Sequence, residues 1–327
     1  MTKRAFVLNT SLLPRPASVT RVQHDLLAWY AHAGRDLPWR TTTDPYAILV
    51  SEVMLQQTQV ERVLPKYQQF LAAFPTLTAL AEAPTADVIS VWVPLGYNRR
   101  AISLQTIARQ VLAEYDGHIP DTLEKLLKLK GVGRYTAGAI ACFAYQQQVA
   151  TVDTNIFRVL HRVFLGLEHP EPKLSTEAMF TFAEQVLPAG AAYDWHQALM
   201  DLGATICTSA NPQCTRCPLQ ESCTAYQELS QYSLFPSGSV LHQLRKVAEK
   251  KASYTTQPFT STNRYFRGRV VAHLRTLPAG EHLALSALGP LLKADYQAED
   301  LPWLEKILAG LQRDGLIAWV EEGVKLP

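Results

Sequence analysis

The chain has 327 residues, of which 47% are hydrophobic, so it can form two domains with sizeable packed cores. This composition excludes a disordered or low-complexity protein. No apolar run is long enough to span a membrane and residues 1–9 lack a signal-peptide pattern, so we expect a cytoplasmic protein, associated with the nucleoid if it binds DNA. The net charge of +2 does not by itself indicate a polyanionic partner.

Helical periodicity dominates residues 18–230, where apolar side chains recur at spacings of three and four. One such series is Val60, Val63, Leu64, Tyr67 and Phe70. Turn signals separate these stretches, and no alternation typical of strands interrupts them. The sequence therefore predicts a mainly α fold.

Residues 231–262 are polar and rich in turn-forming side chains, which indicates a linker. Three short helices and a β-hairpin are expected after it, over residues 264–278, 284–293, 300–314 and 316–326. Three helices and a hairpin are typical of a winged helix, so we expect a small winged-helix-like unit over residues 263–327. A small protein-interaction module is the alternative.

Basic side chains are concentrated in residues 240–275, where only Glu249 is acidic. They are Arg245, Lys246, Lys250, Lys251, Arg264, Arg267, Arg269 and Arg275. A solvated linker and a segment that follows a phosphate backbone both fit this pattern.

Residues 126–141 begin as a helix, break at Gly131 and Gly133, and resume as a helix of small side chains. This pattern predicts a helix–hairpin–helix, in which the glycines permit a tight turn and backbone N–H groups at the start of the second helix bind a phosphate. An ordinary turn between two helices is the alternative.

Two acidic residues occupy unusual places. Glu52 lies in a nearly continuous apolar stretch, where desolvation should raise the pKa of its carboxyl group, and a protonated carboxyl group is the general acid that a leaving nucleobase needs. A salt-bridged surface glutamate is the alternative. Asp153 stands between an apolar run and an amphipathic helix, where by itself it is a good N-cap.

Four of the five cysteines follow the spacing C-x6-C-x2-C-x5-C, at Cys207, Cys214, Cys217 and Cys223. Such clustering indicates a metal site. A zinc ribbon would more usually show two C-x2-C pairs, so the spacing favours an iron–sulfur cluster over zinc. The fifth, Cys142, lies in an apolar helix and is interpreted as a small core residue.

The hairpin, the aspartate after it and the cysteine cluster occur in the order found in the helix–hairpin–helix DNA glycosylases that bear a [4Fe-4S] cluster, and the resemblance covers residues 20–225. Within that superfamily the chain resembles the MutY-type adenine glycosylases. The motifs that carry this resemblance are Asp36-Leu-Pro-Trp39-Arg40, Asp44-Pro45-Tyr46, Ser51-Glu52-Val-Met-Leu-Gln56-Gln57-Thr58, Leu95-Gly96-Tyr97, Gly131-Val-Gly-Arg-Tyr135-Thr-Ala-Gly138 and Met200-Asp-Leu-Gly-Ala204.

The resemblance implies a two-lobed fold, with an iron–sulfur module over residues 18–45 and 151–230 and a six-helix module carrying the hairpin over residues 46–150. It implies that Glu52 protonates N7 of a flipped adenine and that Asp153 stabilises the oxocarbenium-like sugar, while Tyr135 and Asn155 orient these two carboxyl groups. The base pocket would contain Trp39, Arg40 and Gln197. The expected DNA contacts are Gln56, Gln57, Tyr97, Arg99, Arg100, Gly131, Gly133 and Arg134.

The expected activity is hydrolysis of the N-glycosidic bond of adenine mispaired with 8-oxoguanine or guanine in duplex DNA, by a monomer. Relatives with lyase activity place a lysine where this chain has Tyr135, so we expect a monofunctional glycosylase. Breaking this bond passes through a sugar cation, so one carboxyl group should protonate the base and a second, ionised one should face the sugar. The base must first leave the stack.

The chain departs from the family pattern in ways that bear on the base opposite the excised one. It lacks the Nudix-like C-terminal domain and its Phe-Ser-His motif. Val93-Pro94-Leu95-Gly96-Tyr97-Asn98-Arg99-Arg100 replaces the family's Gly-Leu-Gly-Tyr-Tyr, and Thr154 replaces a glycine. A glycosylase for thymine or uracil opposite guanine, or for hypoxanthine, is therefore an alternative. A non-catalytic iron–sulfur DNA-binding protein is an alternative of another class, but it gives no reason for the pairing of Glu52 with Asp153.

Overall fold

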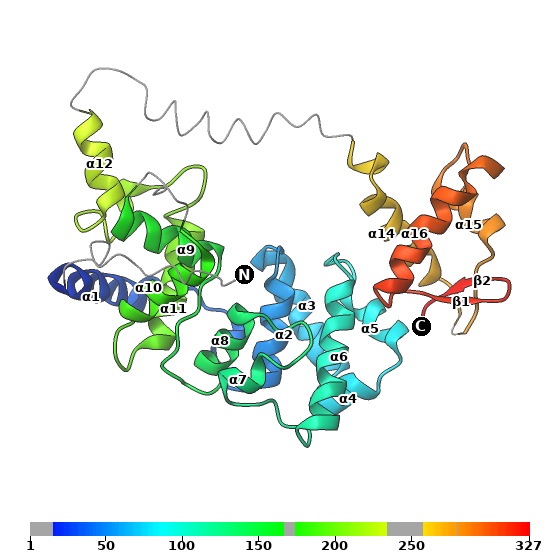
Figure 1. Ribbon diagram of the computed structural model, residues 1–327, viewed down its shortest axis with the longest axis horizontal. Helices are drawn as coiled ribbons and strands as arrows, with labels where there is room; N and C mark the ends of the chain where they lie inside the picture. Colours follow the sequence, from blue (N-terminus) through cyan, green and yellow to red (C-terminus); the bar gives the residue numbers. More distant parts are fainter. Residues whose placement is uncertain (1–15, 167–173, 234–257, 279) are drawn as a thin grey trace, which may run out of the picture. The chain divides into compact units, whose positions relative to one another are not determined.

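The computed structural model describes residues 16–166, 174–233, 258–278 and 280–327. Helices dominate these residues (Figure 1), which confirms the mainly α fold. The chain divides into two compact units, unit 1 from Met1–Pro45 and Gly133–Tyr254 and unit 2 from Tyr46–Val132 and Thr255–Pro327. The resemblance implied boundaries after residues 45 and 150. The units of the structure divide after Pro45 and Val132, and the C-terminal residues group with unit 2. Most of the expected linker, residues 234–257, lies outside the described residues.

Unit 1 is a helical bundle built around α11. Its elements are α1 (Pro16–Ala33), η2 (Pro38–Arg40), α8 (Arg134–Phe143), α9 (Thr154–Leu160), a π-helical turn η3 (His161–Leu165), α10 (Thr176–Gln185), α11 (Ala192–Thr205), η4 (Cys214–Arg216) and α12 (Thr224–Ser233). Helix α11 contacts α1, α8 and α9. Trp195 and Phe182 are fully buried in its core, so burial of large apolar side chains holds this bundle together.

The first part of unit 2 is also helical. Its elements are α2 (Pro45–Leu55), α3 (Val60–Ala73), α4 (Leu77–Glu82), α5 (Thr85–Trp92), α6 (Arg99–Glu114) and α7 (Leu123–Leu126). Helix α6 contacts α4 and α5, and its buried positions Leu104, Ile107, Ala108 and Val111 follow the helical period. Because apolar positions recur on one face, α6 packs along its whole length.

The C-terminal part of unit 2 has three helices and a hairpin, the elements that the sequence predicted there. Its elements are η5 (Phe259–Ser261), α14 (Asn263–Leu274), α15 (Leu285–Leu292), η6 (Ala298–Asp300), α16 (Leu301–Arg313), β1 (Ala318–Val320) and β2 (Gly323–Lys325). The strands are antiparallel, with Trp319 opposite Val324. On the other edge of β2, Leu283 and Val324 form backbone hydrogen bonds in both directions. The hairpin thus gains a short third strand.

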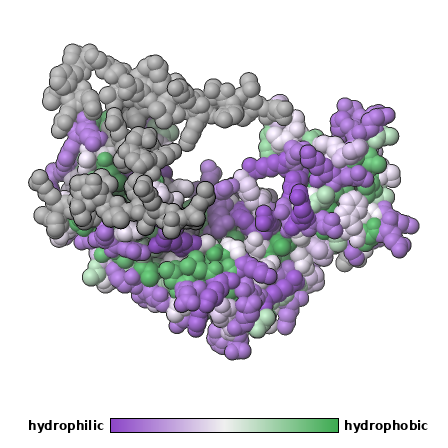
Figure 2. All heavy atoms as spheres, in the orientation of Figure 1, coloured by the Kyte–Doolittle hydropathy of each residue, from purple (hydrophilic) through white to green (hydrophobic). Residues whose placement is uncertain are grey.

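Among the coloured residues of Figure 2, hydrophilic side chains predominate, with smaller apolar patches between them. The large apolar side chains that are exposed in the described part are Tyr97, Leu127, Phe259, Leu291, Leu301 and Trp319. None of the helices in the described ranges has the length and apolar character needed to cross a membrane.

Candidate active site

Glu52 lies on α2, whose residues from Tyr46 to Met54 are all buried. The helix is apolar all round, so it is enclosed on every side rather than lying on a surface. The Glu52 side chain is only 5% exposed. The alternative of a surface glutamate is therefore wrong, and a carboxyl group in this position has lost most of its water.

Arg100, which the sequence suggested as a phosphate contact, instead holds the end of α2. Its side chain is buried, and its two terminal nitrogens donate to oxygen atoms of Val53, Met54, Gln56, Thr58 and Gly96. The carbonyls of Val53 and Met54 belong to the last turn of α2, which has no partners within the helix for such groups. Arg100 is committed to these oxygens, and this replaces the expected phosphate contact.

Two of the expected DNA contacts have left-handed backbones in unit 2. Gln57 has φ 54° and Tyr97 has φ 49°, although neither is glycine. Such residues cost free energy unless their surroundings fix them, and they concentrate at functional sites. Arg100 bonds to the neighbouring Gln56 and Gly96 carbonyls and lies over the Tyr97 ring at 5.4 Å, so one guanidinium supports both turns. Tyr97 is 41% exposed.

The predicted hairpin is present between α7 and α8. Gly131 has φ 89°, a conformation that other residues rarely adopt, and the Val132 amide donates to the Leu129 carbonyl at 3.1 Å. Gly133 precedes α8 as its N-cap. Arg134, expected to contact DNA, forms ion pairs with Glu177 and Glu184 and lies 4.2 Å from the centre of the Phe180 ring.

Asp153 caps α9 and is also a perturbed carboxylate. Its Oδ1 accepts a hydrogen bond from the Ile156 amide at 2.7 Å. Burial raises the pKa of Asp153, whereas hydrogen bonds from the Ile156 and Asn155 amides, the nearby Arg158 and a bond to the Asn155 side chain act in the opposite direction. Asn155 thus contacts the carboxyl group that it was expected to orient.

Close packing of α11 against α9 fixes the position of Asn155. A Cβ atom at Gly203 of α11 would lie 2.8 Å from the Asn155 Cβ, so only glycine fits there. The Gly203 carbonyl accepts from Arg158 at 2.7 Å, and the same Arg158 nitrogen donates to Asn155 Oδ1 at 2.8 Å. The glycine of the Met200-Asp-Leu-Gly-Ala204 motif therefore lets α11 approach the start of α9.

The segment that leads to Asp153 is held by His196, which the sequence reading did not single out. The Thr151 amide donates to Nε2 of His196 at 3.0 Å, and Nδ1 lies 3.6 Å from the Cys142 sulfur. Burial lowers the pKa of His196 to about 4, so the ring is neutral at physiological pH. Cys142 is fully buried, as expected for a core residue.

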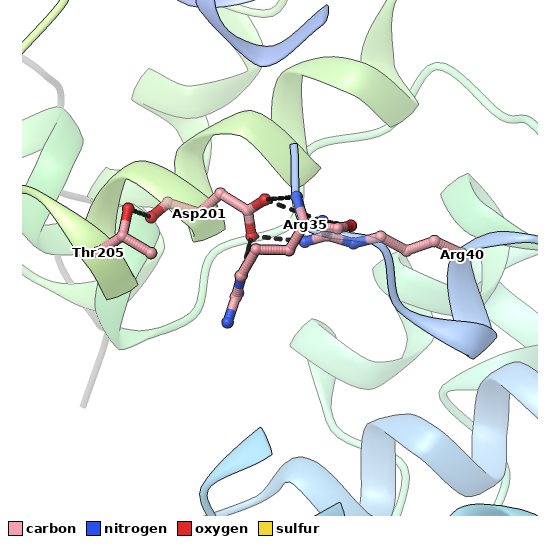
Figure 3. Close-up of polar contacts among 4 residues, drawn as sticks. All are labelled: Arg35, Arg40, Asp201 and Thr205. Carbon is pink, nitrogen blue, oxygen red and sulfur yellow. Dashed lines mark hydrogen bonds and ion pairs between the residues drawn. The ribbon is translucent and has the colours of Figure 1, made fainter. Parts of the chain in front are cut away.

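Asp201 on α11 fastens the segment that carries Trp39 and Arg40 (Figure 3). Arg40 donates two hydrogen bonds to the Asp201 carboxylate, at 2.7 and 2.9 Å, and Arg35 donates through Nε and its backbone amide at 2.7 and 2.9 Å. Burial alone would raise the pKa of Asp201, but these bonds outweigh it and the pKa is lowered. Asp201 is therefore an ionised anchor.

The expected base-pocket residues all belong to unit 1. Trp39 and Gln197 are buried, and Arg40 is nearly so. A cavity of about 400 Å³ opens beside Arg40, lined also by Tyr30, Leu37 and Tyr193. Of the three expected residues, only Arg40 borders this cavity.

The four clustered cysteines lie between α11 and α12. Cys207, Cys217 and Cys223 pack against the core of unit 1, and an Arg162 nitrogen lies 3.5 Å from the Cys207 sulfur. Burial, together with charges on the other cysteines of the set, raises the pKa of Cys217 to about 12 and that of Cys223 to about 11. Within the described ranges, no three His, Cys, Asp or Glu side chains have a geometry that would hold a metal ion.

Comparison with known proteins assigns the family. The HhH-GPD superfamily of base excision DNA repair proteins matches residues 50–184. An adenine DNA glycosylase from Mycolicibacterium smegmatis is 37% identical over 306 residues, which cover 91% of this chain and 93% of that protein. The chain belongs to the adenine DNA glycosylase family.

Two further proteins are similar to this chain, a longer adenine DNA glycosylase and a glycosylase named for thymine. The human adenine DNA glycosylase is 42% identical over 246 residues, 72% of this chain, but the chain covers only 45% of the human protein. A solved thermostable thymine-DNA glycosylase is 30% identical, with a TM-score of 0.61 over 65% of this chain and 98% of its own. The family assignment therefore agrees with the fold. Because the chain covers less than half of the human protein, the activity of that protein is not assigned to this chain from the comparison.

Proposed function

We propose that this protein is a monofunctional DNA glycosylase that binds duplex DNA and hydrolyses the N-glycosidic bond of adenine paired with 8-oxoguanine or guanine. The observation that carries the proposal is Glu52, a carboxyl group that is 5% exposed within a helix buried on all sides. Desolvation of a carboxylate is costly, so burial favours the protonated form of a carboxyl group. A general acid for a leaving base requires this environment.

The second carboxyl group has the opposite requirement. Asp153 should be ionised to stabilise a sugar cation. Burial raises the pKa of Asp153, but the backbone amides at the start of α9, Asn155 and Arg158 limit this rise because they favour the charged form. In this reaction Glu52 protonates adenine at N7, and Asp153 stabilises the positive charge that develops on the sugar. Water then completes the hydrolysis and an abasic site remains.

Tyr135 supports a reaction without strand cleavage. It occupies the first turn of α8, where lyase relatives carry the amine that forms a Schiff base with the sugar. A phenol cannot form that intermediate. Borohydride should therefore trap no covalent complex between the purified protein and an adenine-containing duplex, and a trapped complex would contradict the proposal.

We propose a [4Fe-4S] cluster bound by Cys207, Cys214, Cys217 and Cys223. The donor set fits this group, because four thiols on one short segment interact electrostatically and three of them pack against an apolar core. A zinc ion needs four sulfurs around one centre, whereas a cluster with several irons spreads its ligands more widely. The cluster would crosslink the segment between α11 and α12. Visible absorbance of the purified protein tests this assignment, and a colourless sample that contains zinc would contradict it.

The likeness to a thymine-DNA glycosylase supports a second candidate, removal of thymine or uracil opposite guanine. One experiment separates the candidates: single-turnover excision from duplexes that pair A, T, U or hypoxanthine with G or 8-oxoguanine. We expect the fastest excision for adenine opposite 8-oxoguanine. Faster excision of any other base would replace adenine as the proposed substrate.

We expect a monomer in this assay, because the chain supplies both carboxyl groups.

A further inference from the structure

The C-terminal part of unit 2 docks on α5 and α6. Ile89 of α5 is fully buried in the same apolar cluster as Val271 and Leu308, and Ile102 of α6 packs against that cluster. A shared apolar core fixes the two parts of unit 2 to each other more firmly than polar contacts alone would.

Polar contacts at the edge of this core lead towards the loop of residues 93–98, which carries Tyr97 and which we term the probe loop. The Ala86 amide donates to the carbonyl of Pro327 at 3.1 Å. Arg99, directly after the probe loop, lies 3.7 Å from Asp314. The C-terminal part therefore contacts the elements on both sides of this loop.

Arg264 makes the contact with the probe loop itself. It lies in the first turn of α14, whose N-cap Thr262 accepts a hydrogen bond from the Tyr265 amide. The Arg264 guanidinium carbon is 4.1 Å from the centre of the Tyr97 ring and 5.9 Å from that of Phe259. A guanidinium this close to an aromatic ring is attracted to it.

Tyr97 therefore has two guanidinium neighbours of different origin. Arg100 comes from the first turn of α6 and is buried, whereas Arg264 comes from the C-terminal part and is exposed. The Tyr97 backbone is already left-handed, and the ring retains 41% exposure. Such a ring is restrained and still accessible to a ligand.

We propose that Arg264 is a positioning residue for recognition of the purine opposite the excised base, because it holds the Tyr97 ring for insertion into the duplex. This inference rests on the proposed glycosylase function. A ring that is fixed before binding loses less conformational freedom when it is inserted, so correct pairs gain affinity. Through Arg264, the winged-helix-like part sets the opposite-base preference.

The test compares Arg264→Ala and Arg264→Lys with Arg313→Ala, which removes the same charge from an exposed position on α16. Dissociation constants are measured for duplexes with a tetrahydrofuran abasic analogue opposite 8-oxoguanine or guanine. The selectivity ratio is the dissociation constant for the guanine duplex divided by that for the 8-oxoguanine duplex. We expect Arg264→Ala to lower this ratio about threefold, and Arg264→Lys to give a ratio between those of Arg264→Ala and the wild type. Arg313→Ala should weaken both duplexes equally and leave the ratio unchanged.

The readout that identifies positioning is a double-mutant cycle with Tyr97→Ala. If Arg264 acts through the Tyr97 ring, Arg264→Ala has no further effect on the ratio once that ring is removed. An equal effect in both backgrounds, or a ratio change no larger than that of Arg313→Ala, would overturn the proposal. The abasic analogue requires no excision, so failure of adenine removal would contradict the proposed function without altering this result.

Discussion

Arg100→Lys tests whether a single guanidinium holds both turns that flank the end of α2. The variant keeps the positive charge, and so the desolvation that lowers the pKa of Arg100 to about 10 is not relieved. The two terminal nitrogens of the guanidinium carry four protons and contact five oxygens, whereas an ammonium has three protons, so at least one acceptor loses its donor. At about 1–3 kcal/mol for each unsatisfied buried group, the free energy of unfolding should fall by about 2 kcal/mol.

Urea unfolding followed by circular dichroism measures this loss as a lower midpoint at unchanged slope. Arg99→Lys on the same helix is the control, and the exposure of Arg99 limits its effect to about 0.5 kcal/mol. We also expect Arg100→Lys to bind mismatched duplex less well relative to matched duplex, since Gln57 and Tyr97 lose support. A destabilisation below about 1 kcal/mol would refute the role of Arg100 as the clamp of these turns.

Three further predictions concern unit 1. The pKa of His196 is about 4 in the folded protein and 6.5 in the unfolded protein, so the unfolded state binds a proton first as the pH falls. The free energy of unfolding is therefore highest above pH 6.5 and should be lower by about 2 kcal/mol at pH 5. Urea titrations at pH 7.5 and pH 5 should show this loss in the wild type and not in His196→Gln; equal losses would disprove it. In Asn155→Ala, the pKa of Asp153 should rise because its charged form loses a hydrogen bond, and the acid limb of the excision rate should move to higher pH rather than stay in place. Asp201→Asn should cost about 3 kcal/mol by leaving two arginines without their anion, whereas exposed Asp194→Asn should cost little, and similar losses for the two would count against the anchor.

Periodicity and motif order predicted much of the fold and the candidate residues. The helical phase of α6 also carried a signal that residue types alone do not show. Arg100 precedes the buried Leu104 by one turn, on the face of Ile107 and Val111, whereas Arg99 falls outside that face. The phase therefore distinguishes a buried arginine from an exposed one in an Arg-Arg pair.

Other features depend on contacts between distant segments and have no local signature. Asp201 stands out as a charge in an apolar helix, but its partners lie more than 160 residues earlier in the chain. The contact of Arg264 with Tyr97 requires the packing of the C-terminal part on α5 and α6. Neither pairing follows from spacing, because tertiary packing brings the segments together.

The measurement that tests the central claim most directly is single-turnover excision of adenine opposite 8-oxoguanine by the wild type and Glu52→Gln, together with duplex affinity. Glutamine keeps the shape of the buried side chain but cannot donate the catalytic proton. We predict a loss of at least about a hundredfold in rate at unchanged affinity. Excision by Glu52→Gln at the wild-type rate, or its absence in the wild type, would contradict the account.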